Sequence, residues 1–184
     1  MLRYLVPKFD RADFLPMLHA AAIGAVIAGL YGILHDQITY SISPEYFTRF
    51  KFDQFAYADL RFGDRVFVAT IGFLATWWVG MFAGWFLARY YFPGCPREMA
   101  WRNVFRAMGC LFLVTFLFGA AAYGYGLSLG PGTDLSTWQP MLRSLRIEDG
   151  TAFVRVGMIH NAGYLGALVG LILAIVLVRR SPIA

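Results

Sequence analysis

Residues 66–91 read VFVATIGFLATWWVGMFAGWFLARYY, an apolar stretch whose single charge, Arg89, lies close to its end. An α-helix rises about 1.5 Å per residue, so roughly 20 apolar residues cross the ~30 Å hydrocarbon core of a bilayer. Three other segments share this character, and the full set is Pro16–Tyr40, Val66–Tyr91, Asn103–Leu127 and Phe153–Val178. The sequence therefore predicts an all-α integral membrane protein built as a four-transmembrane-helix bundle.

The composition agrees with a membrane protein. Of the 184 residues, 59% are hydrophobic and 15% are charged, whereas soluble domains carry about 25% charged residues. Because four crossings occupy more than half of the chain, we expect one domain spanning residues 1–184. The net charge of +5 does not indicate a nucleic-acid partner, since the basic residues lie at helix ends, where they orient a membrane protein.

The distribution of Lys and Arg predicts the orientation. With a cytoplasmic N-terminus, nine basic residues fall on cytoplasmic segments and seven on outer segments. The cytoplasmic loop is short and its basic residues lie near helix ends, where this rule works best. We therefore expect both termini in the cytoplasm, and the compact loops favour a bacterial-type inner (plasma) membrane. The first apolar run continues to Leu34, too long for a cleaved signal peptide. The nine cytoplasmic basic residues are Arg3, Lys8, Arg11, Arg89, Arg97, Arg102, Arg106, Arg179 and Arg180.

Three of the predicted helices carry a small residue at every fourth position. Such stripes allow close backbone approach, which drives helix association in lipid. The pattern predicts small-xxx-small packing but leaves open whether each stripe meets a helix of this chain or of a partner. The stripes are Ala20, Gly24, Ala28 and Gly32; Gly72, Thr76, Gly80, Gly84 and Ala88; and Ala162, Gly166, Gly170 and Ala174.

Both predicted outer loops contain amphipathic sequence. The first, Ser41–Arg65, begins a helix at Ser43-Pro44-Glu45, with Ser as the N-cap and Pro at the first helical position. Aromatic and charged residues alternate behind this start. The second loop, Ser128–Ala152, has a further helical stretch around Ser136–Arg146. We expect short interfacial helices in both loops, because aromatic rings are favoured in the headgroup zone.

Four polar side chains in the outer half are candidate metal ligands. His35 and Asp36 end the first helix, Glu45 follows in the loop, and His160 lies two turns into the fourth helix. At 100° per residue, His35 lies about 60° from Gly32 and faces protein. Polar residues at this depth usually face the bundle interior. Two imidazoles with carboxylates suit zinc, iron or copper, so the candidate metal residues are His35, His160, Asp36 and Glu45.

Two other interpretations of these residues stay open. None of them falls at a metal-motif spacing such as H-x-x-x-H or E-x-x-H. The histidines could simply hydrogen-bond backbone or hydroxyl groups, for example those of Tyr40 or Tyr164, with Asp36 capping the helix. They could also form a proton or substrate relay. The third histidine, His19, is expected to be an interfacial residue without chemistry.

Several functional classes are disfavoured. No charged residue lies near the centre of a predicted helix, which argues against an ion-coupled antiporter. Three histidines are too few for a diheme cytochrome, and no nucleotide-binding or hydrolase motif is present. Cys95 and Cys110 are expected on the reducing side and form no C-x-x-C motif, which argues against a disulfide and a thiol oxidase.

The leading functional hypothesis is an accessory or scaffolding subunit of a larger membrane complex. It rests on the small-residue faces, the aromatic outer loops and the lack of a catalytic motif. The alternative is a membrane enzyme or redox protein with the outward-facing metal site. A third hypothesis is a small oligomeric channel or lipid-binding carrier, whose polar lining would be Thr70, Thr76 and Thr115. Expected partners are the bilayer and other membrane subunits or further copies of this chain.

Overall fold

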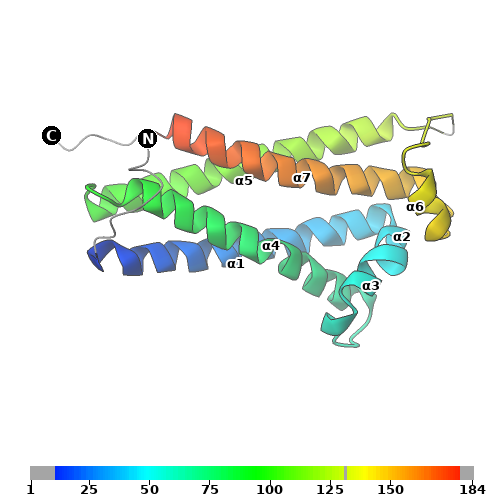
Figure 1. Ribbon diagram of the computed structural model, residues 1–184, viewed down its shortest axis with the longest axis horizontal. Helices are drawn as coiled ribbons and strands as arrows, with labels where there is room; N and C mark the ends of the chain where they lie inside the picture. The colour runs from blue at the N-terminus through cyan, green and yellow to red at the C-terminus, as the bar shows by residue number, and fades with distance from the viewer. Residues whose placement is uncertain (1–10, 131, 179–184) are drawn as a thin grey trace.

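The computed structural model describes residues 11–130 and 132–178, and within them every regular element is helical (Figure 1). Four long helices form the body: α1 (Arg11–Ile42), α4 (Asp64–Tyr91), α5 (Arg97–Leu127) and α7 (Gly150–Leu177). Each is long and apolar enough to cross a membrane, which confirms the four predicted apolar helices. Much of the evidence for the orientation, including Arg3, Lys8, Arg179 and Arg180, lies outside the described residues.

All four long helices begin earlier than predicted, two of them by five or six residues. The first continues through Pro16 to Arg11, although proline lacks the N–H that would bond the carbonyl of Ala12. Arg97 satisfies that carbonyl instead, since its Nη2 donates to Ala12 O at 3.1 Å. The third long helix begins at Arg97, not at Asn103. Both errors have one cause: the first turns carry charged residues, which an apolar criterion leaves out.

Helices α1 and α4 pack backbone to backbone along two of the predicted stripes. A Cβ placed on Gly24 would overlap the carbonyl oxygen of Gly80, and one on Gly32 would overlap that of Gly72. In the same interface, Thr76 Oγ1 lies 2.7 Å from Ala28 O and 2.8 Å from Gly72 O. Close contact between these stripes replaces the apolar burial that would hold helices together in water.

Helices α5 and α7 form a second pair. A Cβ on Gly166 would press on Thr115 and Phe118, and one on Gly170 would press on Leu111. The third stripe therefore also packs inside the chain. The two pairs lie side by side, α1 with α4 and α5 with α7 (Figure 1).

Two buried clusters join the pairs at opposite ends of the bundle. At the end with the α4–α5 turn, Tyr91 packs among apolar residues of all four helices, and its hydroxyl lies 2.7 Å from Val178 O. At the other end, which we call the loop end, Tyr46 and Phe47 pack against Phe153 and its neighbours. The loop end holds five short elements: α2 (Pro44–Tyr46), the π-helix η2 (Phe47–Lys51), α3 (Phe52–Gln54), the 3-10 helix η3 (Ala56–Ala58) and α6 (Gln139–Ser144).

Replacing Gly80 with valine should weaken the α1–α4 pair, because the new Cβ would overlap Gly24 O and crowd Ala28. Overpacking of this kind costs about 1–3 kcal/mol, so we expect a lower Tm in detergent. Gly109→Val is the matched control, since a Cβ on Gly109 meets no atom within 4 Å. Equal losses from the two variants would contradict backbone packing at Gly80.

Candidate functional site

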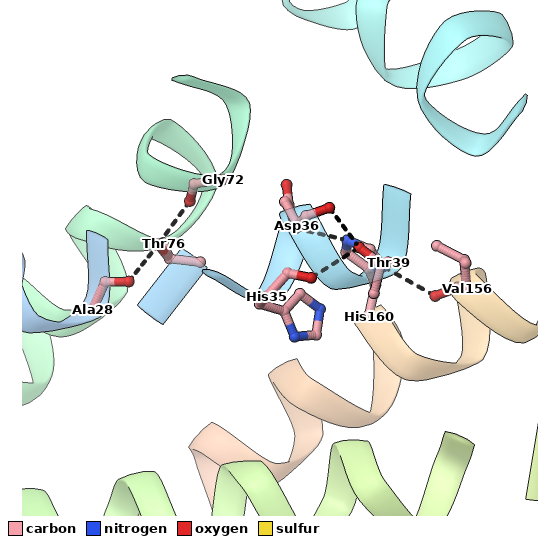
Figure 2. A network of polar contacts seen from close by, with 8 residues as sticks. All are labelled: Ala28, His35, Asp36, Thr39, Gly72, Thr76, Val156 and His160. Atoms are coloured by element: carbon pink, nitrogen blue, oxygen red, sulfur yellow. Dashed lines mark hydrogen bonds and ion pairs between the residues drawn. The ribbon is translucent and has the colours of Figure 1, made fainter. Parts of the chain in front are cut away.

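Three of the predicted ligand residues meet at the loop end. His35 and Asp36 come from the last turns of α1, and His160 comes from α7 (Figure 2). One ligand atom from each of the three lies within 4.8 Å of the others. Because α1 and α7 belong to different helix pairs, this His–Asp–His cluster joins the two halves of the bundle with polar groups.

Hydrogen bonding fixes the tautomer of His160. Its Nδ1 lies 2.9 Å from Val156 O, and a carbonyl only accepts, so Nδ1 carries a proton. The other ring nitrogen, Nε2, lies 3.2 Å from Asp36 Oδ1. Two lone pairs do not face each other at this distance without a positive charge or a proton between them. The contact therefore holds either a proton, shared by an imidazolium or a carboxylic acid, or a metal cation.

The cluster lies in apolar surroundings. Asp36 is 4% exposed, and an uncompensated carboxylate in such a place costs several kcal/mol. The ring of His35 stands edge-on to that of His160, with centroids 4.9 Å apart and planes at 83°. Neither ring nitrogen of His35 has a hydrogen-bond partner within the described part of the chain. His35 therefore brings an unused nitrogen lone pair to a buried carboxylate.

Glu45, the fourth predicted ligand, is engaged elsewhere. Its two carboxylate oxygens accept hydrogen bonds from the backbone N–H groups of Glu148 and Asp149, at 3.0 and 2.9 Å. These amides precede α7, where the helix dipole favours a negative charge. Glu45 thus ties the first loop to the start of α7, and it is not one of the three residues of the cluster.

A short aromatic segment, Tyr46 of α2 with the π-helix η2, covers the cluster on the loop side; we call it the covering segment. The ring of Tyr46 stacks on that of His160, with centroids 5.0 Å apart and planes at 24°. On η2, Lys51 Nζ lies 5.9 Å from the Tyr46 ring and 5.2 Å from the Phe50 ring. Burial raises the pKa of the Tyr46 hydroxyl, and the charge of Asp36 acts in the same direction, so this hydroxyl stays protonated at neutral pH.

Lys51, on η2, lies beside the aromatic rings of Tyr46 and Phe50. Burial lowers the pKa of its ammonium, while the negative charge of Asp36 partly opposes that shift. Lys51 therefore adds a positive potential on the loop side of the cluster, with the Tyr46 ring beside it. The π-helical turn that carries Lys51 is of a kind found frequently at functional sites.

A narrow cavity adjoins the cluster between the two helix pairs. All four long helices line it, and its walls are apolar apart from two tyrosines, two threonines and the cluster itself. Its volume, counted as the space that the centre of a water molecule can occupy, is about 80 Å³. Thr76 and Thr115 supply no free hydrogen-bond donor, because the hydroxyl of each donates to a backbone carbonyl. The remaining polar groups of the wall gather at the loop end.

The structure separates the other candidates from this site. Tyr40 does not bond either histidine, because its hydroxyl donates to Asp64 Oδ2 at 3.1 Å. His19 is exposed and remote from the cluster. The sequence also allowed the histidines to hydrogen-bond backbone groups. One ring nitrogen does so, since His160 Nδ1 bonds Val156 O.

Sequence reasoning did not assign Tyr31 and Tyr46 to the site. Tyr31 lies one helical turn before His35, and its ring is 5.6 Å from that of the histidine. That spacing of four residues places the two on one face, so the signal was present in the sequence. Tyr46 offers no such signal, because its stacking on His160 depends on the fold of the loop.

A comparison of the chain with known proteins finds no matching family model, no matching curated sequence and no matching solved structure. The functional argument therefore depends on the geometry of the site.

Proposed function

We propose that this chain is a multi-pass membrane enzyme or redox protein that binds one divalent transition-metal ion at His35, Asp36 and His160. The observation that carries the proposal is the orientation of His160. Its Nδ1–H is held by Val156 O, which leaves the Nε2 lone pair toward Asp36. Metal-binding histidines almost always anchor their second nitrogen in this way.

The distances suit an ion. Ligand atoms about 2.0–2.2 Å from a metal, at a tetrahedral angle, lie roughly 3.3–3.6 Å apart. The separation of 3.2 Å between His160 Nε2 and Asp36 Oδ1 is just below this range. His35 offers a ring nitrogen within 4.8 Å of the other two ligand atoms, and this nitrogen would have to move closer to become the third ligand.

The number of ligands favours a reactive site over a structural one. Structural zinc sites use four protein ligands, whereas catalytic sites use three and keep an open position. Two histidines with one carboxylate also form the ligand set of many iron(II) oxygenases. The described residues supply three ligands. The open coordination position of a bound metal would face the adjoining cavity.

The accessory-subunit hypothesis stays a prediction with less support. One of its observations was an excess of small-residue faces, but the three stripes pack inside this chain. The channel hypothesis also stays a prediction with less support, since the hydroxyls of Thr70, Thr76 and Thr115 all donate to backbone carbonyls. A proton relay remains the direct rival, because a proton could take the place of the metal between His160 and Asp36.

We also propose that the protein spans a bacterial-type inner membrane with both termini in the cytoplasm, so that the cluster lies in the outer half. The bias of Lys and Arg supports this orientation. In a variant lacking Cys95 and Cys110, a cysteine at Tyr57, which is 79% exposed, should react with an impermeant maleimide added to intact cells. Labelling only after the cells are opened would reverse the orientation.

Metal binding is tested on the purified full-length protein in mild detergent. After treatment with a chelator, addition of Zn²⁺ or Fe²⁺ should restore about one ion per chain. Inductively coupled plasma mass spectrometry measures the metal content. His35→Phe keeps a flat ring and removes both nitrogens, and it should lower the metal affinity at least ten-fold. Since the His35 nitrogens make no hydrogen bond, we expect this variant to fold.

Two controls separate ligands from neighbours. His19→Ala removes a histidine remote from the cluster and should leave metal binding unchanged. Glu45→Gln should also keep the ion, but it should lower the stability by about 1–3 kcal/mol, because one charged acceptor of two amides is lost. Absence of stoichiometric metal in the wild type, or equal metal in His35→Phe, would refute the metal site and leave the proton relay.

A further inference from the structure

We propose that the cavity between the helix pairs binds a single-chain amphiphile with a neutral, oxygen-bearing head group, placed with its head at the His–Asp–His cluster. This names the substrate class of the proposed metal site and rests on that function for the contact with the metal. The chain-binding part of the cavity stands on its own geometry.

The shape of the cavity fits one apolar chain. Along α1 it extends from Gly24 to Asp36, which is roughly 18 Å at 1.5 Å per residue. Glycines form part of the wall, among them Gly80 and Gly84. The space that the centre of a water molecule can occupy in the cavity is only about 80 Å³, which suits one chain better than a two-chain lipid or a protein helix.

The cavity reaches the surface of the bundle, from which a membrane-soluble molecule would enter. Tyr164 lines it and is also 47% exposed. Next to it, Gly163 lines the cavity with open space in front, because a Cβ placed there meets no atom within 4 Å. The cavity wall is therefore open at Gly163 and Tyr164 of α7.

Two hydroxyls at the loop end suit an oxygen-bearing head group. Tyr31 precedes His35 by one turn, and Tyr164 follows His160 by one turn; both line the cavity. Neither hydroxyl has a hydrogen-bond partner among residues 11–130 and 132–178, so both can donate. Flat rings flank this end, with Tyr31 and Phe112 centroids 6.0 Å apart.

Charge selects a neutral head. Asp36 lies at the same end of the cavity, so an anionic head would meet a carboxylate. A cationic head would compete with the metal for the same groups. A carbonyl or hydroxyl oxygen avoids both conflicts, because it accepts from tyrosine and can approach an open metal position.

The probes are a benzoquinone bearing one decyl chain and a long-chain alcohol, which share this chemistry and distinguish a planar from a simple head. Native mass spectrometry of the detergent-solubilised protein should show saturable binding of one molecule of at least one probe per chain. Gly163→Leu should fold, since leucine favours helix more than glycine does, and should fill the cavity. We expect its affinity for the probe to fall at least ten-fold.

Gly109→Leu is the matched control, because Gly109 is exposed on α5, lies off the cavity wall and has open space at its Cβ. It should bind the probe like the wild type. Equal binding by Gly163→Leu, or no saturable binding of either probe, would overturn the inference, as would preferential binding of a two-chain phosphatidylcholine.

Parallel measurements on metal-depleted and zinc-loaded protein keep this test apart from that of the proposed function. Metal binding without Gly163-dependent probe binding would refute the amphiphile and leave the metal site intact. Probe binding that depends on Gly163, in a chain that takes up no metal, would support the cavity as the binding site and refute the contact of the head with a metal.

Discussion

The structure depends on one polar contact in an apolar bundle, that between Asp36 and His160 Nε2. A carboxylate that is 4% exposed needs a compensating positive charge or a proton. Since Val156 O holds the other nitrogen of His160, the imidazole brings that compensation only as an imidazolium, through a shared proton, or together with a metal. Removing the compensation would leave a buried charge between the two helix pairs, so the contact also bears on how the halves associate.

Packing explains why this contact lies beside a cavity. The glycines of α1 and α4 bring two backbones together, as Gly24 and Gly80 illustrate, and those of α7 do the same with α5. Helices paired so closely leave their side chains to fill the space between the pairs. Apolar clusters fill it at both ends, whereas the middle is lined by small residues such as Ala28, Ala75 and Gly163. The cluster lies where this space meets the loop end.

The covering segment encloses the cluster on the loop side. Tyr46 and Phe47 are buried over His160, and Glu45 fixes the segment to the start of α7. This covering segment shields the cluster from bulk water on that side, which strengthens the electrostatic interactions within it. The proposed amphiphile would then enter from the bundle surface along α7.

Hydropathy predicted the four long helices but missed first turns that carry charges, as at Arg97. Periodicity predicted the small-residue stripes, yet Gly24 gave no indication that its partner would be Gly80 of the same chain. Helical angles correctly suggested that His35 and His160 could approach each other. They could not exclude Glu45, because its partners are backbone amides, which have no signature in the sequence. The stacking of Tyr46 on His160 depends on the geometry of the loop, so it could not be predicted from the sequence either.

The most direct measurement is X-ray absorption at the zinc edge on the zinc-loaded protein in lipid nanodiscs. The account predicts two imidazole nitrogens and a carboxylate oxygen at about 2.0–2.2 Å, with an additional light-atom ligand at the open position. In His35→Phe one imidazole should disappear from the spectrum. A sulfur shell near 2.3 Å, as expected from cysteine ligands, or a shell without imidazole would contradict it.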